Sequence, residues 1–160
     1  MPRQLRVMLD TSVYEFLVLR YLDELNKLIH EGQVIVYGCS VVRKELRETS
    51  KSEKLEGKSF RNALLSAYDD VTDKHSYPAE NVVDFIAEEY WKEYEGGIAK
   101  RKMMNDFRIV AVSSIHNLDI VVSEDNHSMK SRLAIEAYMK VNQRNGFRTP
   151  MFYSISQLLP

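Results

Sequence analysis

Four acidic residues stand at positions where a carboxylate is unusual. Asp10 and Asp125 each follow a short apolar run that is typical of a buried strand. Glu45 and Asp106 lie among apolar residues that repeat with helical spacing, so both face inward from predicted helices. An ionised carboxylate that faces a core costs free energy unless it is paired or bound to a cation. Residue type and placement therefore indicate acid chemistry or cation binding at these four positions.

Two of the four acids also have a structural interpretation. Asp10 directly precedes a predicted helix and can cap it, and Glu45 can form a buried ion pair with a nearby Arg or Lys. Such roles explain each acid singly. They do not explain why four acids occupy comparable positions in one chain.

A cluster of these acids could not stay fully ionised and empty. Two charges about 5 Å apart repel by about 3 kcal/mol at an effective dielectric constant near 20. The cluster must therefore raise some pKa values or bind cations. Oxygen ligands suit Mg²⁺ or Mn²⁺, whereas the sequence has no Cys and His set with the spacing of a zinc site. Two such ions held by carboxylates can hydrolyse a phosphodiester bond.

The acids meet only if the elements that carry them form a parallel sheet covered by helices. Ligands of such sheets bind at the carboxyl ends of the strands, where Asp10 and Asp125 stand. The hydrophobic pattern predicts strands and helices in alternation along the whole chain. The predicted strands are residues 5–9, 33–37, 119–123 and 147–154. The predicted helices are 12–30, a helix after Ser40 that carries Glu45, 60–68, 80–94, a helix from about 98 or 103 to 116, and 128–141.

Capping residues mark several predicted helix starts. Ser12 and Glu15 have the spacing of a capping box, and Ser40 and Ser128 stand where an N-cap is expected. Residues 69–72 are expected to be extended, with a loop after them.

Composition limits the class of protein. The chain has 160 residues, 44% of them hydrophobic and 28% charged, which predicts one soluble domain over residues 1–160. Its net charge of −1 gives no global argument for nucleic-acid binding. No stretch is long and apolar enough for a membrane span, and Cys39 is a single cysteine expected to be buried and inert. We expect a cytoplasmic protein with no membrane partner.

Local basic clusters flank two of the acids. Such clusters are usually solvated helix faces, but here they could also hold the phosphates of RNA near Glu45 and Asp106. The candidate residues are Arg43, Lys44, Lys100, Arg101 and Lys102.

The acids lie in four short motifs. These are D-T-S at residues 10–12, V-x-x-E-L at 42–46, N-D-F-x-I-x-A at 105–111 and V-V-S-x-D at 121–125. In this order and spacing the chain resembles the PIN domain family over essentially its whole length. The resemblance implies a three-layer α/β/α sandwich with a central, mainly parallel sheet, and a divalent-metal-dependent endoribonuclease.

The resemblance also assigns roles to residues. It implies that Asp10, Glu45, Asp106 and Asp125 bind Mg²⁺ or Mn²⁺ and form the catalytic site. Supporting roles fall to Thr11, Ser123 and Asn105. Implied partners are RNA, an antitoxin-like protein and a second copy of the chain in a homodimer.

The chain departs from the family pattern at a few places. Ser123 replaces the usual Thr, Asn126 and His127 follow Asp125, and residues 49–97 are longer than in the shortest toxin-type members. The motifs of dinucleotide-binding and phosphate-loop proteins are absent from the sequence. The alternative is a catalytically silent PIN-like scaffold that binds RNA or protein.

Overall fold

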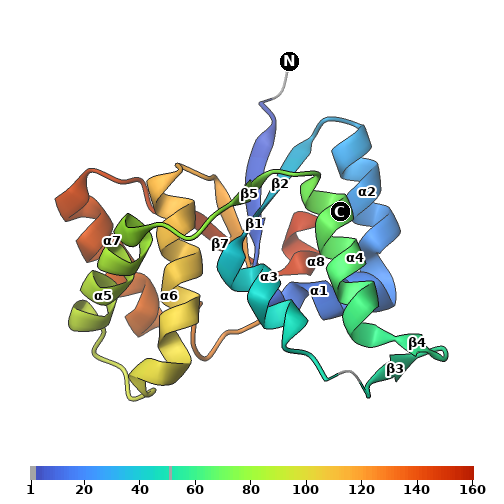
Figure 1. The fold of residues 1–160 in the computed structure, drawn as a ribbon. Coiled ribbons are helices and arrows are strands. Elements are labelled where there is room, and N and C mark those ends of the chain that lie inside the picture. The colour runs from blue at the N-terminus through green and yellow to red at the C-terminus, as the bar shows by residue number, and fades with distance from the viewer. Residues whose placement is uncertain (1–2, 51) are drawn as a thin grey trace.

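A parallel sheet runs through the centre of the molecule. The computed structural model describes residues 3–50 and 52–160 (Figure 1). Within them, five strands pair in the order β5-β2-β1-β6-β7, and every pair is parallel. The strands are β1 Leu5–Leu9, β2 Val34–Cys39, β5 Ser76–Tyr77, β6 Ile120–Val122 and β7 Met151–Tyr153.

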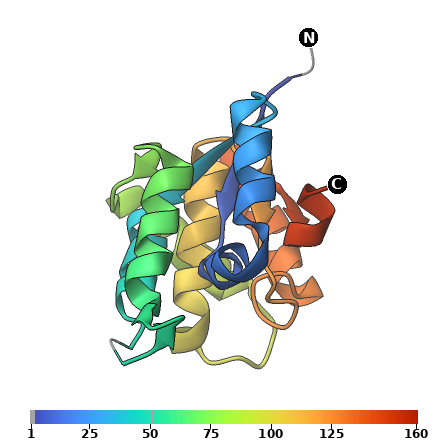
Figure 2. The same ribbon diagram turned by 90° about the vertical axis from the view of Figure 1, so that its right-hand side faces the viewer.

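Helices cover both faces of this sheet (Figures 1 and 2). One layer contains α1 Thr11–Phe16, the π-helical segment η1 Leu17–Tyr21, α2 Leu22–His30 and α4 Phe60–Thr72. The other contains α5 Asn81–Glu93, α6 Lys100–Ile115 and α7 Arg132–Asn145. The predicted α/β/α sandwich is confirmed. The remaining elements are α3 Ser40–Arg47, a hairpin of β3 Lys54–Leu55 and β4 Lys58–Ser59, and α8 Ile155–Leu158.

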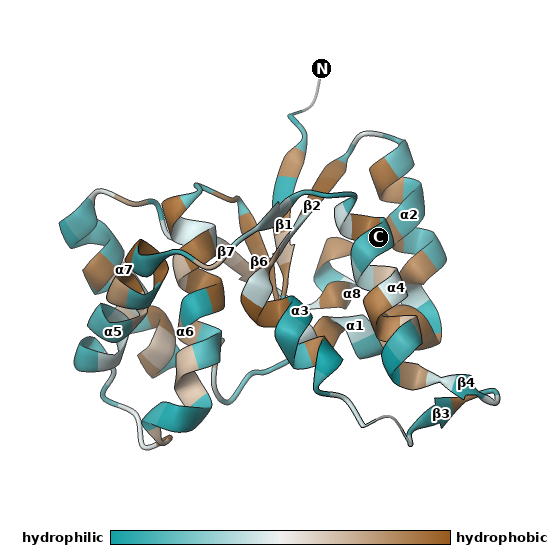
Figure 3. Ribbon diagram, viewed as in Figure 1, coloured by the Kyte–Doolittle hydropathy of each residue, from teal (hydrophilic) through white to brown (hydrophobic). Residues whose placement is uncertain are grey.

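The central strands are almost continuously apolar because helices cover them on both sides. Val7, Met8 and Leu9 of β1 have no exposed surface, and all three residues of β6 are buried. Figure 3 shows this apolar centre, with hydrophilic residues on the outer sides of the helices. The residues at the carboxyl edge of the sheet therefore follow strands that are fully packed in the core.

Three predicted helix caps are wrong. The cap of α1 is Asp10, whose side chain accepts a hydrogen bond from the Thr11 amide, so Ser12 lies inside the helix. Cys39, not Ser40, precedes α3, and Ser131, not Ser128, caps α7. The hydroxyls of Ser12 and Ser128 make other contacts instead, Ser12 with Asp10 and Ser128 with Asp106.

The segment between α4 and α5 also differs from the prediction. Residues 69–72, predicted as extended, continue α4, because Val71 and Thr72 extend the buried face of Leu64 and Tyr68 at helical spacing. The predicted loop after them contains β5, which pairs with the end of β2. This two-residue strand is too short to give a periodic signal.

A glycine lets α4 pack directly on the end of β2. A Cβ atom on Gly38 would lie 2.1 Å from the Tyr68 hydroxyl oxygen, so only glycine leaves room for that ring. The Tyr68 hydroxyl donates a hydrogen bond of 3.2 Å to the Cys39 carbonyl. This contact fixes the point at which β2 passes into α3 and hence the position of Glu45.

Cys39 itself is buried, and burial raises the pKa of its thiol to about 11. A protonated, covered thiol is unreactive, as the sequence predicts. In the described part of the chain, every helix is too short or too polar to cross a bilayer.

Candidate active site

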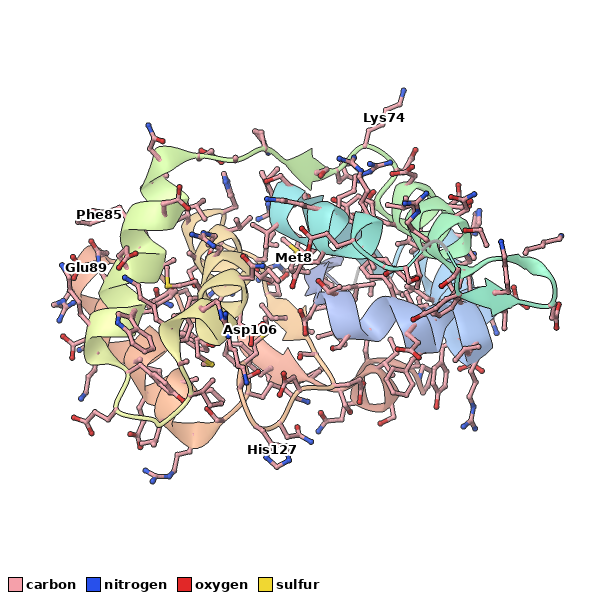
Figure 4. The ribbon with its side chains drawn as sticks, turned by 60° about the horizontal axis from the view of Figure 1, so that its bottom comes forward. Met8, Lys74, Phe85, Glu89, Asp106 and His127 are labelled. Atoms are coloured by element: carbon pink, nitrogen blue, oxygen red, sulfur yellow. The ribbon has the colours of Figure 1, made fainter. Side chains whose placement is uncertain are left out.

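All four predicted acids lie at the carboxyl edge of the sheet or on helices that border it. Asp10 follows β1, and the segment after β6 carries Asp125. Glu45 stands on α3 and Asp106 on α6. Figure 4 turns this edge toward the viewer and shows Asp106 at the centre of the molecule, with His127 on the outer loop below it.

Asp10 is the most deeply buried of the four. Its side chain is 4% exposed and accepts three hydrogen bonds. The Thr11 amide donates to Oδ1 at 2.7 Å, while the hydroxyls of Ser12 and Ser123 donate to Oδ2 at 2.9 and 2.8 Å. Burial nevertheless raises the pKa of Asp10 above its usual value, because these neutral donors do not replace the water that the charge has lost.

Thr11 joins Asp10 to Glu45. Its amide binds Asp10, and its hydroxyl donates to Oε1 of Glu45 at 2.7 Å. Partial burial raises the pKa of Glu45, and the nearby charge of Asp10 raises it further, against the lowering effect of the Thr11 hydrogen bond. The two carboxylates are therefore close enough to repel each other.

Ser128 joins the other two acids. Its hydroxyl lies 2.7 Å from Oδ2 of Asp106 and also contacts Oδ2 of Asp125. Because one hydroxyl carries one proton, it can donate to only one of these carboxylates at a time. Burial, followed by the charge of Asp10, raises the pKa of Asp106 to about 7.

Asp125 differs from the other three. Burial works to raise its pKa, but hydrogen bonds from the Ser128 hydroxyl, the Ser128 amide and the His127 amide outweigh that effect and lower it. Its own amide donates to the Ser123 hydroxyl oxygen at 3.0 Å, and Ser123 in turn donates to Asp10. Ser123 thus connects the Asp10 and Asp125 halves of the site.

The result is a chain of carboxylates joined by neutral hydroxyl and amide groups. Among residues 3–50 and 52–160, none of the four acids forms an ion pair with Lys or Arg. No three His, Cys, Asp or Glu side chains of this described part are arranged to hold a metal ion together. The chemistry of the donors nevertheless fits a hard divalent cation, because every donor is oxygen and three carboxylates have raised pKa values.

Two serines contribute to this site although the sequence reading assigned them to helix caps. Ser12 donates to Asp10 and Ser128 contacts both Asp106 and Asp125. A signal for Ser128 exists in the run D-N-H-S. An aspartate often accepts hydrogen bonds from amides two and three residues later, and that turn brings the serine back beside it.

The five predicted RNA-binding cations separate into two groups. Arg43 forms a double hydrogen bond with Asp69 on α4, and Lys100 pairs with Glu88 at 2.8 Å. Lys44 instead lines an open cavity that Glu45 and Asn105 also line. The remaining two, Arg101 and Lys102, are exposed at the start of α6.

Asn105 precedes Asp106 on α6 and accepts a hydrogen bond of 3.0 Å from the Arg108 guanidinium. Arg108 was not among the residues singled out from the sequence. Its position, two residues after Asp106, brings it to the same cavity as Lys44.

Comparisons with known proteins place this geometry in context. The sequence matches no family model and no curated protein. The fold does match solved structures, although at low sequence identity. VapBC2 from Rickettsia felis, bound to a promoter DNA fragment, matches with a TM-score of 0.60 at 14% identity, covering 94% of this chain and 98% of that one.

Two further structures agree. DNA-bound VapBC from Salmonella typhimurium matches with a TM-score of 0.59 at 11% identity, covering 94% of this chain and 98% of that chain. FitAcB from Neisseria gonorrhoeae matches with a TM-score of 0.54 at 18% identity, covering 92% and 96%. The parallel sheet, its helical layers and these matches together show that this chain has a PIN-like α/β/α fold.

Proposed function

We propose that this chain acts in the cytoplasm as an endoribonuclease that hydrolyses single-stranded RNA with the help of Mg²⁺ or Mn²⁺. One observation carries the proposal above all. Four carboxylates near the carboxyl edge of the sheet belong to one network of hydroxyl and amide groups, without a Lys or Arg partner among the described residues. Such a cluster requires protons or cations from outside.

Asp10, Glu45, Asp106 and Asp125 would hold the metal. When bound, a divalent cation lowers the pKa of a coordinated water and stabilises the charge of the leaving oxygen. The hydroxyls of Thr11, Ser12, Ser123 and Ser128 orient the carboxylate oxygens, because each hydroxyl already contacts one or two of them. Asn105 lines the cavity that Glu45 also lines, and would support the site from α6.

Basic side chains would hold the RNA backbone. Lys44 lines the cavity beside Glu45, and Arg101 and Lys102 are exposed near the start of α6. In the described chain, Arg43 and Lys100 already have carboxylate partners, so we assign them a smaller share of phosphate binding. Affinity should weaken with salt in proportion to the number of phosphates neutralised.

We also propose that the chain is the toxin of a toxin–antitoxin pair, with an antitoxin-like protein partner, and that it forms a homodimer. Support comes from the fold match to two VapBC structures and to FitAcB. Both VapBC structures contain bound DNA, in one case a promoter fragment. The second candidate function is a scaffold that binds RNA or protein without cleaving.

The test is cleavage of a panel of RNAs with Mn²⁺ or Mg²⁺ by the wild type and by Asp10→Asn. Asn keeps the shape of the side chain but removes one metal-binding charge, so cleavage should fall by at least about a hundredfold. Asp70→Asn is the matched control, because Asp70 is exposed on α4, a helix that carries none of the four acids. It should cleave like the wild type.

Two other results would reject the proposal. If the wild type and Asp10→Asn cleave equally, the activity belongs to a contaminant. If neither cleaves and both bind RNA, the scaffold function replaces the nuclease.

A further inference from the structure

An open cavity of about 460 Å³ lies beside the acidic site. Residues from α3, α5 and α6 line it, and Glu45 is a wall that it shares with the carboxylate cluster. Its volume falls in the range of roughly 300–1,000 Å³ that small-molecule sites occupy. A base of an RNA strand bound at the acidic site could therefore enter this cavity, next to the reacting phosphate.

Arg108 lines this cavity, and its guanidinium forms two hydrogen bonds with neighbouring side chains. Its Nε donates to Oδ1 of Asp84 at 2.9 Å, and its Nη1 donates to Oδ1 of Asn105 at 3.0 Å. A guanidinium has five N–H donors, so three remain without a contact among the described residues. Two anchors on one planar group fix the direction of the remaining donors before any ligand arrives.

The cavity combines donors and acceptors. Arg108 and Lys44 supply N–H groups, while Glu45, Glu48 and Asp84 supply carboxylates. A phosphate inside the cavity would find two cations but three anions, so the charges of the lining do not favour it there. Lys44 is exposed and would meet backbone phosphates outside the cavity. A neutral ligand with both hydrogen-bond acceptors and donors fits better.

Guanine has that pattern. Its O6 and N7 are adjacent acceptors, for which Arg is the commonest partner, and its Watson–Crick edge carries N–H donors that a carboxylate can accept. Single-stranded RNA presents such edges freely, because its bases can leave the stack. Adenine has a donor at the position of O6 and therefore opposes the guanidinium.

We propose that this cavity binds a guanine base next to the cleaved bond and that Arg108 is the residue that determines this specificity. The position of the base next to a cleaved bond rests on the proposed nuclease function, whereas the binding of guanine does not. Glu48 and Asp84 accept the N–H donors of the base, and Arg108 donates to its O6 and N7.

Binding is measured first, because it needs no catalysis. The full-length wild type in EDTA is titrated with single-stranded oligouridine RNAs that carry one guanosine, inosine or adenosine at the centre. We expect about tenfold tighter binding of the guanosine RNA than of the adenosine RNA, within the range measured for single base contacts. Inosine lacks the exocyclic amine and should fall between them.

Variants of Arg108 distinguish the effect of its planar N–H donors from the effect of its positive charge. Arg108→Lys keeps the cation but loses the planar donors, so the preference for guanosine should disappear while total affinity changes little. Arg144→Gln is the matched control, because Arg144 also holds two carboxylates, Glu89 and Glu93, but lies outside the cavity. It should keep the preference. Thermal unfolding of each variant verifies that it is folded.

Equal affinity for the guanosine and adenosine RNAs overturns the inference, even if the protein proves to be a nuclease. Retention of the preference in Arg108→Lys overturns the role of Arg108. Cleavage of a randomised RNA with Mn²⁺ then tests the position: guanosine should be enriched on one side of the cut in the wild type. A preference in binding with no cleavage at all would reject the nuclease and leave the guanine site standing.

Discussion

Asp119 and Asp10 are both buried carboxylates at the ends of central strands, yet their charges are compensated differently. Asp119 stands at the amino end of β6, is 8% exposed, and accepts hydrogen bonds of 2.8 Å from Arg3, Arg148 and the Arg6 amide. Burial alone would raise its pKa, but these contacts lower it below the usual value. Asp10, at the opposite edge of the sheet, has only neutral donors among the described residues, and its pKa is raised.

The difference separates a structural acid from a candidate functional one. At Asp119 the compensating charge is part of the chain, so the carboxylate is complete when the protein folds. At the cluster around Asp10 the hydroxyls supply geometry but no charge. Buried charge without a built-in partner is costly, and proteins keep it where an external cation or a reaction uses it.

The largest effect should follow from giving the acidic cluster a built-in cation. Asn105→Lys places an ammonium group beside Glu45 and Asp106, as the arginines stand beside Asp119. Affinity for Mn²⁺ and cleavage should each fall by about a hundredfold, the upper range for changes next to metal ligands. The metal-free protein should become more stable. Calorimetry with Mn²⁺ and denaturant unfolding in EDTA measure both.

Asn105→Met is the control for this variant, because it has a long side chain without charge. It also loses the contact with Arg108. If Asn105→Met and Asn105→Lys lose equal metal affinity, side-chain size explains the effect and the comparison of charges fails.

A smaller effect is expected where the built-in partner is removed from the opposite edge. Asp119→Asn should lower the free energy of unfolding at neutral pH by about 2 kcal/mol, since hydrogen bonds to a charged group are lost. The pKa of Asp119 is lower in the folded state than in the unfolded state. Its contribution to the free energy of unfolding is therefore present above the unfolded pKa of about 3.9 and is lost as the pH falls through the folded pKa.

Urea unfolding of the wild type and Asp119→Asn from pH 7 to pH 2.5 measures this dependence. The two curves should be separated above about pH 5 and converge in acid, below both pKa values. A difference that stays constant over the whole pH range would show that Asp119 acts through its shape and not its charge.

The smallest effect is expected at Ser128. Ser128→Ala removes a donor from Asp106 and Asp125, which should lower metal-free stability by about 1 kcal/mol. Saturating Mn²⁺ should reduce that difference, because a cation then compensates both carboxylates. Unfolding with and without Mn²⁺ measures it.

Ser131→Ala is the matched control for Ser128→Ala. Ser131 caps α7 by accepting a hydrogen bond from the Ala134 amide, and losing a cap costs about 1 kcal/mol. That cost should not depend on metal. If Mn²⁺ affects both variants alike, Ser128 has no special relation to the acids.

The sequence was most informative where residue type conflicted with its surroundings. Asp10 ends an apolar strand, and Glu45 and Asp106 interrupt apolar helical faces. Each acid therefore stands out in the hydrophobic pattern of the sequence. The strands at the centre of the sheet were predicted from a different signal. Burial on both sides leaves a continuous apolar run in the sequence.

Other features had no such signal. Ser128 was assigned to a helix cap, because a serine before a helical pattern has the same appearance whether or not it turns toward a carboxylate. Arg108 looks like one more surface cation until tertiary packing brings Asp84 of α5 beside it. β5 consists of two residues, and pairing with β2 makes it a strand.

The contact between Ser123 and Asp10 also affects when the site can first exist during synthesis. It spans 113 residues, and Ser128, which holds the other two acids, comes later still. Ribosomes add roughly 5–20 residues per second, and amino-terminal segments emerge first. A nascent chain therefore carries Asp10 and Glu45 for several seconds without the residues that complete the cluster. The cluster can therefore form only after the segment that carries Ser123 and Ser128 has been synthesised.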